Sequence, residues 1–251
     1  MRLVVWNCNM ALHNKFQHLA ALNPDVAIIP ECGRIELIAE RHNGFSPNSA
    51  IWVGDNPKKG LGILTFGSFT GTLDHAHRPD IPYFAPVRIQ GSICFNLLGV
   101  WACHNKPTSY EADIGPMRRA IKAYQTFIQR GSAVVAGDFN NNVRWDRPHS
   151  KRNNHAMAVE GLEALDLKSA YHETRGIAQG NEPDPTLYWR DRQLNGWRYH
   201  IDYCFVPKQW IDATSVAVGT FEDWVARRLS DHVPLIIEVN EGLTSPTSEG
   251  R

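Results

Sequence analysis

Short runs of aliphatic, β-branched and aromatic residues recur along the chain, separated by polar turns. Gly, Pro and Asn bound most of these runs, a pattern that is typical of β-strands. Other segments carry apolar residues three or four positions apart, as one face of a helix requires. The pattern predicts strands at residues 2–6, 25–29, 50–53, 61–66, 85–89, 93–101, 132–136, 186–189, 201–206, 215–218 and 233–239.

The clearest helical pattern lies near the middle of the chain, where Pro116 can occupy the first turn. Its apolar face would consist of Ile114, Met117, Ile121, Tyr124 and Ile128. Weaker helical patterns cover residues 12–22, 34–41 and 155–165. Because the strands are more numerous than one short sheet needs, we expect an α/β (α+β) architecture of two packed sheets with helices outside.

Length and composition limit the classes of protein that the chain can be. Its 251 residues, 43% of them hydrophobic, fit one large domain or two small ones; we expect a single domain at 1–240 and a flexible tail at 241–251. Lys plus Arg (26) equal Asp plus Glu (26), so the net charge is zero. A protein that coats nucleic acid by charge alone would be basic, whereas an enzyme with acidic metal ligands and basic substrate contacts can be neutral.

The cysteines and apolar runs indicate the compartment. None of the five cysteines has Cys-x-x-Cys spacing, so a reducing, cytoplasmic environment is expected instead of a disulfide scaffold. No secretory signal or membrane-length apolar stretch is visible, and we expect a monomer without a membrane partner. The positions of Cys8, Cys32, Cys103 and His104 match no compact zinc pattern, so the thiols are expected to face the core.

Polar side chains stand at the ends of several predicted strands. The run 132–136 leads into Gly137-Asp138-Phe139-Asn140, where the glycine allows a sharp turn. One other strand leads to Glu31, and another leads to Asn7 and Asn9. Oxygen-rich sets of this kind suit Mg²⁺, with Mn²⁺ as a substitute, and can transfer a phosphoryl group to water. Further polar residues at strand ends are His104, Asn105, Asp202, Asp231 and His232.

Each of these residues also has an ordinary structural interpretation. The alternatives are a solvated loop for Glu31, a turn for Asp138 and Asn140, a helix cap for Asp231 and a surface position for His232. Because several such polar residues stand together at strand ends, we favour the functional interpretation. The histidines and aspartates within residues 74–80 could bind a second metal, but are expected to be ordinary loop residues.

Basic and aromatic residues occur in the loops beside these motifs. Arginine or lysine occupies positions 144, 147, 151, 152, 190, 192, 198, 227 and 228. If the fold brings these loops together they would bind phosphates; otherwise they are ordinary solvated charges. We expect Trp189 in the core, whereas other tryptophans could stack on bases. The predicted substrate contacts are Asn9, Asn105, Arg144, Trp145 and Trp224.

Taken in order, the motifs resemble the endonuclease/exonuclease/phosphatase superfamily, which includes exonuclease III-like DNA repair nucleases and DNase I-like nucleases. The resemblance covers residues 2 to about 239 and implies a four-layered sandwich of two packed mixed β-sheets flanked by helices. It rests on Trp6-Asn7, the strand leading to Glu31, Gly137-Asp138-Phe139-Asn140, His200-Ile201-Asp202-Tyr203 and Ser230-Asp231-His232.

The resemblance implies roles for the metal-binding and water-activating residues. Glu31 would hold the metal, helped by Asn7 and Asp231. Asp138 would orient or deprotonate the attacking water, with Asn140 beside it. These assignments place a hard cation and a base on the same phosphate.

The resemblance also implies contacts to the phosphate. His232, held in one tautomer by Asp202, would contact the scissile phosphate as base or as transition-state stabiliser. His104 would bind the phosphate from the opposite side. Two positions depart from the family pattern: Pro30 replaces a common Gln, and Cys103-His104 replaces the Tyr of the exonuclease III branch.

The leading hypothesis is therefore a Mg²⁺-dependent phosphodiester hydrolase, a DNA nuclease of exonuclease III-like type. It would act on double-stranded DNA as a 3′→5′ exonuclease, an abasic-site endonuclease or both, leaving a 5′-phosphate. An RNase, or a phosphatase or phosphodiesterase on small or lipid phosphoesters, remains the alternative, because the same catalytic set addresses the phosphate and not the leaving group. A degenerate relative that only binds nucleic acid is disfavoured, since every expected polar position is filled.

Overall fold

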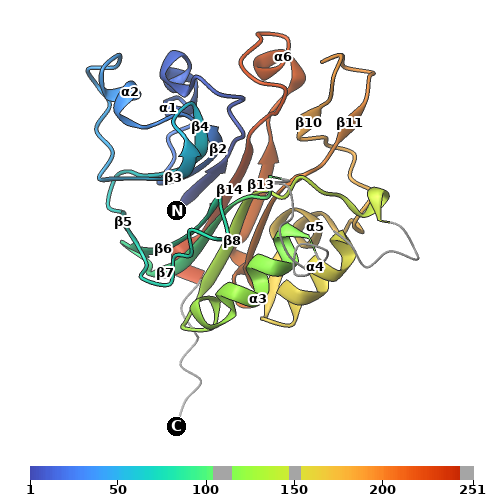
Figure 1. The fold of residues 1–251 in the computed structure, drawn as a ribbon. Helices are drawn as coiled ribbons and strands as arrows, with labels where there is room; N and C mark the ends of the chain where they lie inside the picture. Colours follow the sequence, from blue (N-terminus) through green and yellow to red (C-terminus); the bar gives the residue numbers. More distant parts are fainter. Residues whose placement is uncertain (104–114, 147–153, 244–251) are drawn as a thin grey trace.

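Two β-sheets form the centre of the computed structural model, which describes residues 1–103, 115–146 and 154–243 (Figure 1). Within these residues each sheet has six strands. The first sheet has the order β13 (Thr214–Val218), β14 (Leu235–Val239), β1 (Arg2–Val5), β2 (Val26–Cys32), β4 (Lys59–Thr65) and β3 (Ser49–Asn56). The second has the order β5 (Thr70–Leu73), β6 (Phe84–Gln90), β7 (Phe95–Trp101), β8 (Ala133–Asp138), β12 (Asp202–Pro207) and β9 (Leu167–Ser169).

A parallel pair lies at the centre of each sheet, β1 with β2 and β7 with β8. The other neighbouring strands of the two sheets run antiparallel, so both sheets are mixed. Two parallel neighbours end at the same edge of a sheet. The polar residues that follow the central strands are therefore collected at one edge of each sheet.

The two sheets face one another across a shared hydrophobic core. Successive side chains of a strand point to opposite faces. In β1, Leu3 and Val5 enter the core between the sheets, while Val4 packs on the outer side. In β8, Val134 enters the inner core and Val135 packs outward. Because both faces are covered, these strands are apolar throughout, which is why the sequence pattern identifies them readily.

Helices cover the two outer faces. On the second sheet lie α3 (Pro116–Ile128) and α4 (His155–Glu163), which share a core cluster with the outer residues of β7, β8 and β12. On the first sheet lie η1 (Leu12–Asn14), α1 (Phe16–Ala20) and α2 (Glu36–Ala39), whose apolar residues pack with those of β1 and β2. The architecture is thus a four-layered α/β sandwich, which confirms the predicted fold (Figure 1).

The sequence pattern does not predict several short elements. Edge strands β5 and β9 have few residues, and β5 is largely exposed, so neither shows a clear apolar pattern. Strand β10 (Leu187–Tyr188) lies within the predicted strand at 186–189, and it pairs in a two-stranded hairpin with β11 (Arg198–Tyr199), which is not predicted. The other unpredicted elements are α5 (Ala170–Arg175), η3 (Val143–Trp145), η4 (Lys208–Ala213), α6 (Phe221–Trp224) and η5 (Glu241–Leu243).

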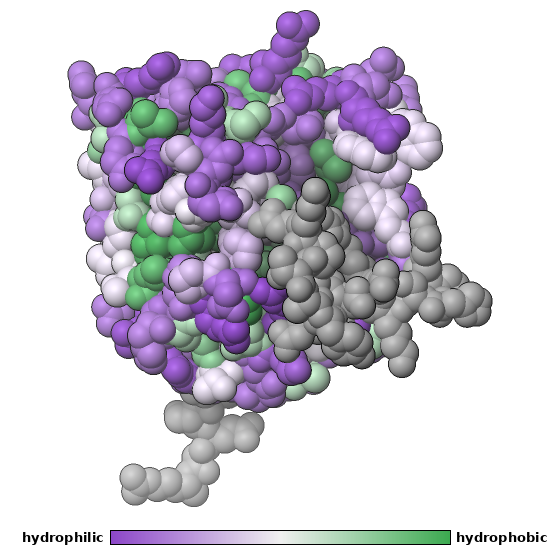
Figure 2. Space-filling model, in the orientation of Figure 1, coloured by the Kyte–Doolittle hydropathy of each residue, from purple (hydrophilic) through white to green (hydrophobic). Residues whose placement is uncertain are grey.

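Hydrophilic residues predominate on the face of the molecule shown in Figure 2. On the face shown in Figure 2 the apolar residues form smaller areas between polar ones. Within the described ranges, no helix combines the length and the apolar character that crossing a membrane requires.

Two buried histidines that pack against Tyr203 make the fold sensitive to acid. Burial lowers the pKa of His155 and of His200 to about 4, below the ordinary 6.5. Between these values the unfolded chain binds more protons than the folded protein, so the free energy of unfolding should fall as the pH drops from about 6.5 towards 4. The expected loss is on the order of 3 kcal/mol for each histidine.

Denaturant unfolding at a series of pH values measures this loss. His155→Gln should flatten the dependence between pH 6.5 and 4, whereas His75→Gln, at an exposed loop position, should leave it unchanged. An identical slope in wild type and His155→Gln would refute the assignment to His155.

Candidate active site

The ends of the central strands bring three polar side chains into contact. Asn7 follows β1, Glu31 lies in β2 and Asp138 is the last residue of β8. The Asn7 amide nitrogen donates to Asp138 Oδ2 at 2.9 Å and to Glu31 Oε1 at 3.4 Å. Asn7 and Asp138 are buried, and Glu31 is half-buried. One amide therefore bridges two carboxylates, one from each sheet.

Glu31 reaches the site through a β-bulge. Pro30 pairs with Leu61 and Cys32 pairs with Gly60, so Glu31 is an extra residue between two regular pairs. Its φ of 55° lies in the left-handed region, which a residue with a Cβ adopts only where its surroundings enforce it. The strand thus continues past Glu31, and the bulge re-aims the carboxylate towards Asn7.

The turn after β8 holds Asp138 from a second direction. Asp138 Oδ1 accepts the backbone N–H of Asn140 at 2.8 Å, and Oδ2 accepts the Asn140 side-chain nitrogen at 3.2 Å. Asn140 adopts a φ of 48°, which asparagine tolerates better than most residues. The turn and the functional interpretations of this motif therefore coincide, because the turn is what fixes the carboxylate.

Gly137 permits the close packing of β8 against β7 at the site. Its φ is 148°, and a Cβ at this position would lie 1.8 Å from the carbonyl oxygen of Val100. No side chain larger than hydrogen fits there unless one of the strands moves. The contact with the backbone of β7 therefore requires glycine at the position before Asp138.

We expect Gly137→Ala to lower the free energy of unfolding by at least about 2 kcal/mol, since strand displacement is the only relief for the clash. Denaturant unfolding is the measurement. Gly131→Ala is the matched control, because a Cβ at Gly131 meets nothing within 4 Å. Equal stability of the two variants would show that β7 and β8 do not approach closely at Gly137.

Asp202 and His232 form a hydrogen-bonded pair next to Asp138. Strand β12 places Asp202 opposite Asp138 in the antiparallel register. His232 Nδ1 lies 2.8 Å from Asp202 Oδ2, which fixes the ring and leaves Nε2 for substrate. Two side chains that the sequence pattern does not mark secure the pair: Thr186 Oγ1 accepts the Asp202 N–H at 3.1 Å, and Ser230 Oγ accepts the His232 N–H at 3.0 Å.

The buried charges shift the pKa values of the site. Burial and the neighbouring Asp202 carboxylate raise the pKa of Asp138 to about 7. Burial opposes protonation of His232, but the charge of Asp202 and its hydrogen bond outweigh burial and raise the pKa of His232 to about 10. Asp138 therefore titrates near neutral pH, as a general base requires, beside a protonated imidazole.

The donor set fits a divalent cation. Among the described residues, one group of three potential ligands has its ligand atoms within 4.8 Å of one another, formed by Asp138, Asp202 and His232. Asp202 Oδ1 is buried and has no hydrogen-bond partner in the described part of the chain. A buried carboxylate oxygen requires a proton, a donor or a cation. Two further carboxylates, Glu31 and Asp231, lie at the same edge, bonded to Asn7 and Asn9.

The amides of Asn7 and Asn9 contact the acidic residues of the site. Asn7 turns its nitrogen towards the carboxylates of Glu31 and Asp138, and its metal ligation stays a prediction. Its Oδ1 accepts the Asn9 N–H at 3.0 Å. Asn9, predicted as a substrate contact, donates through Nδ2 to Asp231 Oδ1 at 2.9 Å. Asn7 and Asn9 therefore orient the acidic residues of the site.

The exposure of the tryptophans in the loops beside the site differs from the prediction. Trp224 is only 7% exposed and packs edge-on against Trp6, with ring centroids 4.8 Å apart, so its predicted stacking role is wrong. Trp189, expected in the core, is 40% exposed, and Trp145 is 39% exposed. Trp197 is 63% exposed, although the loop pattern favoured Trp145 and Trp224 over it. The residue type alone does not tell which of these tryptophans are exposed and which are buried.

An aromatic and basic surface surrounds the β10–β11 hairpin. The ring centroid of Tyr199 lies 4.7 Å from that of Trp145 and 6.2 Å from that of Trp189. The Arg190 guanidinium lies over Trp189 at 4.1 Å, and Arg144 is exposed beside Trp145. The predicted residues His104, Asn105, Arg147, Lys151 and Arg152 lie outside the described residues.

The thiols near the site are unpaired, as are all five cysteines. Cys8 and Cys32 are buried in the outer core of the first sheet, which agrees with the prediction. Cys103 is only partly buried against the inner core. Burial raises the pKa of Cys8 to about 12, so it remains a thiol, and it donates to the Glu31 carbonyl oxygen at 3.4 Å.

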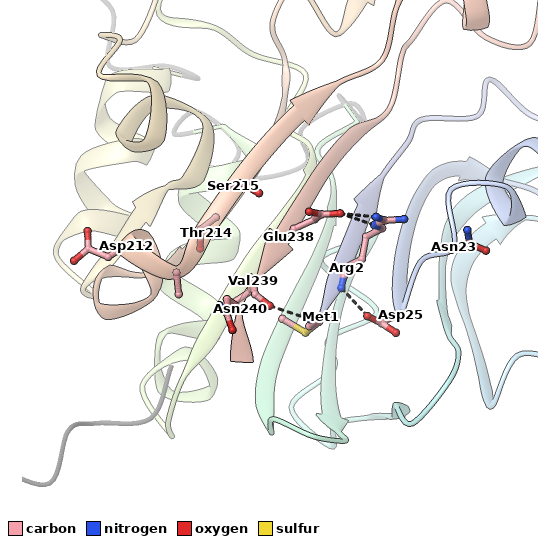
Figure 3. A pocket seen from close by; sticks show the side chains of 11 residues that line it. Met1, Arg2, Asn23, Asp25, Asp212, Thr214, Ser215, Glu238, Val239 and Asn240 are labelled. Atoms are coloured by element: carbon pink, nitrogen blue, oxygen red, sulfur yellow. Dashed lines mark hydrogen bonds and ion pairs between the residues drawn. The ribbon is translucent and has the colours of Figure 1, made fainter. Parts of the chain in front are cut away.

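A separate hollow of about 630 Å³ lies at the opposite end of β1 from Asn7 (Figure 3). One basic side chain of the hollow is paired with a lining carboxylate. Arg2 Nη2 lies 2.5 Å from Glu238 Oε1, and the Arg2 N–H donates to Asp25 Oδ2 at 2.6 Å. The hollow is therefore separate from the cluster of Asp138, Asp202 and His232.

The fold and the site define a class of protein, an α/β sandwich with a carboxylate–histidine centre at its strand ends. The model of the Endonuclease/Exonuclease/phosphatase family matches residues 4–232. The chain belongs to this family, which confirms the resemblance inferred from the motifs.

Solved structures of low sequence identity share the fold. A 3′-5′ exonuclease from Neisseria meningitidis has a TM-score of 0.67 and 17% identity, with 96% of this chain and 100% of that chain covered. An AP endonuclease from Archaeoglobus fulgidus has a TM-score of 0.62 and 17% identity, covering 96% and 99%. A Neisseria 3′ phosphatase bound to product DNA hairpin has a TM-score of 0.62 and 19% identity, covering 96% and 99%. No curated protein sequence matched the chain.

Proposed function

We propose that the protein is a Mg²⁺-dependent phosphodiesterase that cleaves DNA, of the exonuclease III-like type. The position of Asp138 carries this proposal. It is a buried carboxylate that Asn7 connects to Glu31, and it lies opposite the Asp202–His232 pair. A base, a charged imidazole and an oxygen ligand for a hard cation in one site form the minimum set for attack of water on a phosphodiester.

In the proposed reaction each residue acts on a different part of the phosphate. Asp138, fixed by Asn140, takes a proton from the water that attacks phosphorus. His232 donates from Nε2 to a non-bridging oxygen, and Asp202 stabilises its positive charge. Glu31 and Asp231 would hold Mg²⁺ through their carboxylates. The cation would neutralise negative charge on the phosphate and on the leaving group. The P–O3′ bond breaks as the new P–O bond forms, which leaves a 5′-phosphate, and the departing 3′-oxygen takes a proton from solvent water to become a 3′-hydroxyl.

The aromatic and basic surface around the β10–β11 hairpin favours nucleic acid over a small phosphoester as the substrate. The hairpin that carries the exposed aromatic residues is fixed to the site, because the Tyr188 N–H donates to the Asp231 carbonyl oxygen at 2.8 Å and Leu187 pairs with His232. Exposed indole rings can stack on bases, and neighbouring guanidinium groups can contact phosphates. Similar structures include an AP endonuclease and a phosphatase bound to product DNA hairpin, which favours the same assignment.

A comparison of substrates tests the proposal. The purified protein with Mg²⁺ is given end-labelled linear, nicked and abasic duplex DNA, the matching RNA, and small phosphoesters. We expect the highest kcat/KM on a DNA duplex, with 5′-phosphate products. A higher kcat/KM on a small phosphoester or on RNA would mean that DNA is not the preferred substrate. Turnover of none of them would reject the enzymatic proposal.

Trp197→Ala should raise the KM for duplex DNA roughly 5- to 100-fold, the equivalent of about 1–3 kcal/mol for one stacked base. Trp197→Phe keeps an aromatic face and should stay nearer to wild type. Turnover of bis(p-nitrophenyl) phosphate should be unchanged in both variants, because this substrate lacks the flanking nucleotides whose bases Trp197 would contact. An unchanged KM for DNA in Trp197→Ala would remove Trp197 from the binding surface.

A further inference from the structure

A largely buried lysine connects backbone groups close to the site. Lys15 stands between η1 and α1. Its ammonium donates to the carbonyl oxygen atoms of Cys8, of Asn9 at 3.5 Å and of Leu229 at 2.7 Å. An ammonium has three N–H donors, and here three carbonyl oxygens lie within their reach. Lys15 Nζ also lies 5.9 Å from the ring centroid of Trp6.

These carbonyl groups belong to the two loops that present acidic residues and their amide partners. Cys8 and Asn9 follow β1, directly after Asn7, and Leu229 stands two residues before Asp231. The two loops also touch directly, because Asn9 Nδ2 donates to Asp231 Oδ1 at 2.9 Å. Lys15 therefore joins the loop of Cys8 and Asn9 to the loop of Leu229, which lies 214 residues after Lys15 in the sequence, at the point where the two loops meet the site.

The loop after β1 has a backbone conformation that needs restraint. Asn9, Met10 and Ala11 have φ values of 47°, 61° and 48°, so three successive residues with a Cβ are left-handed. This region is unfavourable for L-residues other than glycine. The loop would relax without contacts that hold it, and the carbonyl oxygens of Cys8 and Asn9 are bonded by Lys15.

Lys15 also contributes positive charge without occupying the acidic groups. Burial lowers the pKa of Lys15, while the charges of Asp231 and Glu31 act in the opposite direction and favour the ammonium form. Its donors are directed at carbonyl oxygens, so the carboxylates stay available to a cation. Lys15 therefore acts on Asp231 and Glu31 through its charge and not through hydrogen bonds.

We propose that Lys15 is a positioning residue, whose ammonium holds the loop of Asn7 and Asn9 against the loop of Asp231 before metal or substrate binds. Through Asn9 it fixes Asp231, and through Asn7 it fixes Glu31 and Asp138. The catalytic consequence rests on the proposed function, whereas the effect on loop order and cation binding does not.

Lys15→Met tests this role, since methionine keeps the apolar stem and removes the charge and donors. In the metal-free protein, amide hydrogen exchange at residues 7–11 should be at least about tenfold faster than in wild type. Mn²⁺ affinity, measured calorimetrically without substrate, should fall about 10- to 100-fold, and kcat should fall similarly with KM for DNA unchanged. Lys208→Met, at an exposed lysine, is the control and should match wild type in all three.

A double-mutant cycle separates positioning from general destabilisation. Asn9→Ala and Lys15→Met should together weaken Mn²⁺ binding by less than the product of their separate effects, because Lys15 acts through Asn9. If Lys15→Met does not fold, Lys15→Gln, neutral and shorter, should show the same losses to a smaller degree.

Wild-type hydrogen exchange and Mn²⁺ affinity in the folded Lys15 variants would overturn the proposal, as would fully independent effects in the cycle. Wild-type protein that fails to bind Mn²⁺ would overturn it too. If no form hydrolyses a phosphoester but Lys15→Met still changes hydrogen exchange and Mn²⁺ affinity, the proposed function fails and the positioning role stands.

Discussion

Asp138→Asn should lower kcat for phosphodiester hydrolysis by about 10²- to 10⁴-fold, the usual contribution of a positioned general base. Asparagine has nearly the same shape but cannot accept a proton from water. The free energy of unfolding should change by less than about 1 kcal/mol, since relief of repulsion with Asp202 offsets weaker hydrogen bonding with Asn7. Steady-state kinetics and denaturant unfolding at neutral pH measure the two quantities.

The control for this substitution is Asp212→Asn. Asp212 is an exposed carboxylate that lines the hollow at the far end of the first sheet (Figure 3), so its variant should keep wild-type kcat. Turnover by Asp138→Asn at the wild-type rate would assign the base to another group. A large loss of stability would instead mean that Asp138 is chiefly a structural residue.

Asp202→Asn should also lower kcat by about 10²- to 10⁴-fold, through the imidazole and not the base. Asp202 supplies the charge and hydrogen bond that raise the pKa of His232 to about 10 against the effect of burial. Without them the pKa of His232 falls, so the protonated form that stabilises the phosphate is lost at a lower pH.

The pH–rate profile distinguishes this mechanism from simple misfolding. The residual activity of Asp202→Asn should decline with rising pH earlier than wild-type activity does, and Asp212→Asn should follow wild type. An equal high-pH limit in wild type and Asp202→Asn would contradict the role of Asp202 in holding a proton on His232.

The sequence predicts those parts of the fold in which local pattern and long-range packing agree. Strand β8 is apolar on both faces because it is buried on both, and α3 has the predicted buried face from Met117 to Ile128. The same agreement holds at the site, where Asp138 and Asp202 end and begin strands that pair with each other. Short edge elements such as β5 are stabilised by neighbours and carry too few apolar residues to be recognised.

Features that depend on contacts between distant segments are not encoded locally. The bulge that directs Glu31 depends on the register of β2 with β4. Trp189 and Trp224 have the same side chain, but Trp224 packs against the buried Trp6 in the outer core of the first sheet, whereas Trp189 is exposed. Lys15 looks like an ordinary surface lysine until the loop of Leu229 is brought against it. These positions are set by tertiary packing, which overrides residue type.

We propose that the strand ends form a cation-dependent phosphoesterase site organised around Glu31 and Asp138. The most direct measurement is cleavage of end-labelled duplex DNA as a function of Mg²⁺ concentration, for wild type and for Glu31→Gln. We predict no cleavage in EDTA, recovery on addition of Mg²⁺, and a shift of the Mg²⁺ requirement to higher concentration in Glu31→Gln. Cleavage that persists in EDTA, or an identical Mg²⁺ dependence in the two proteins, would contradict the claim.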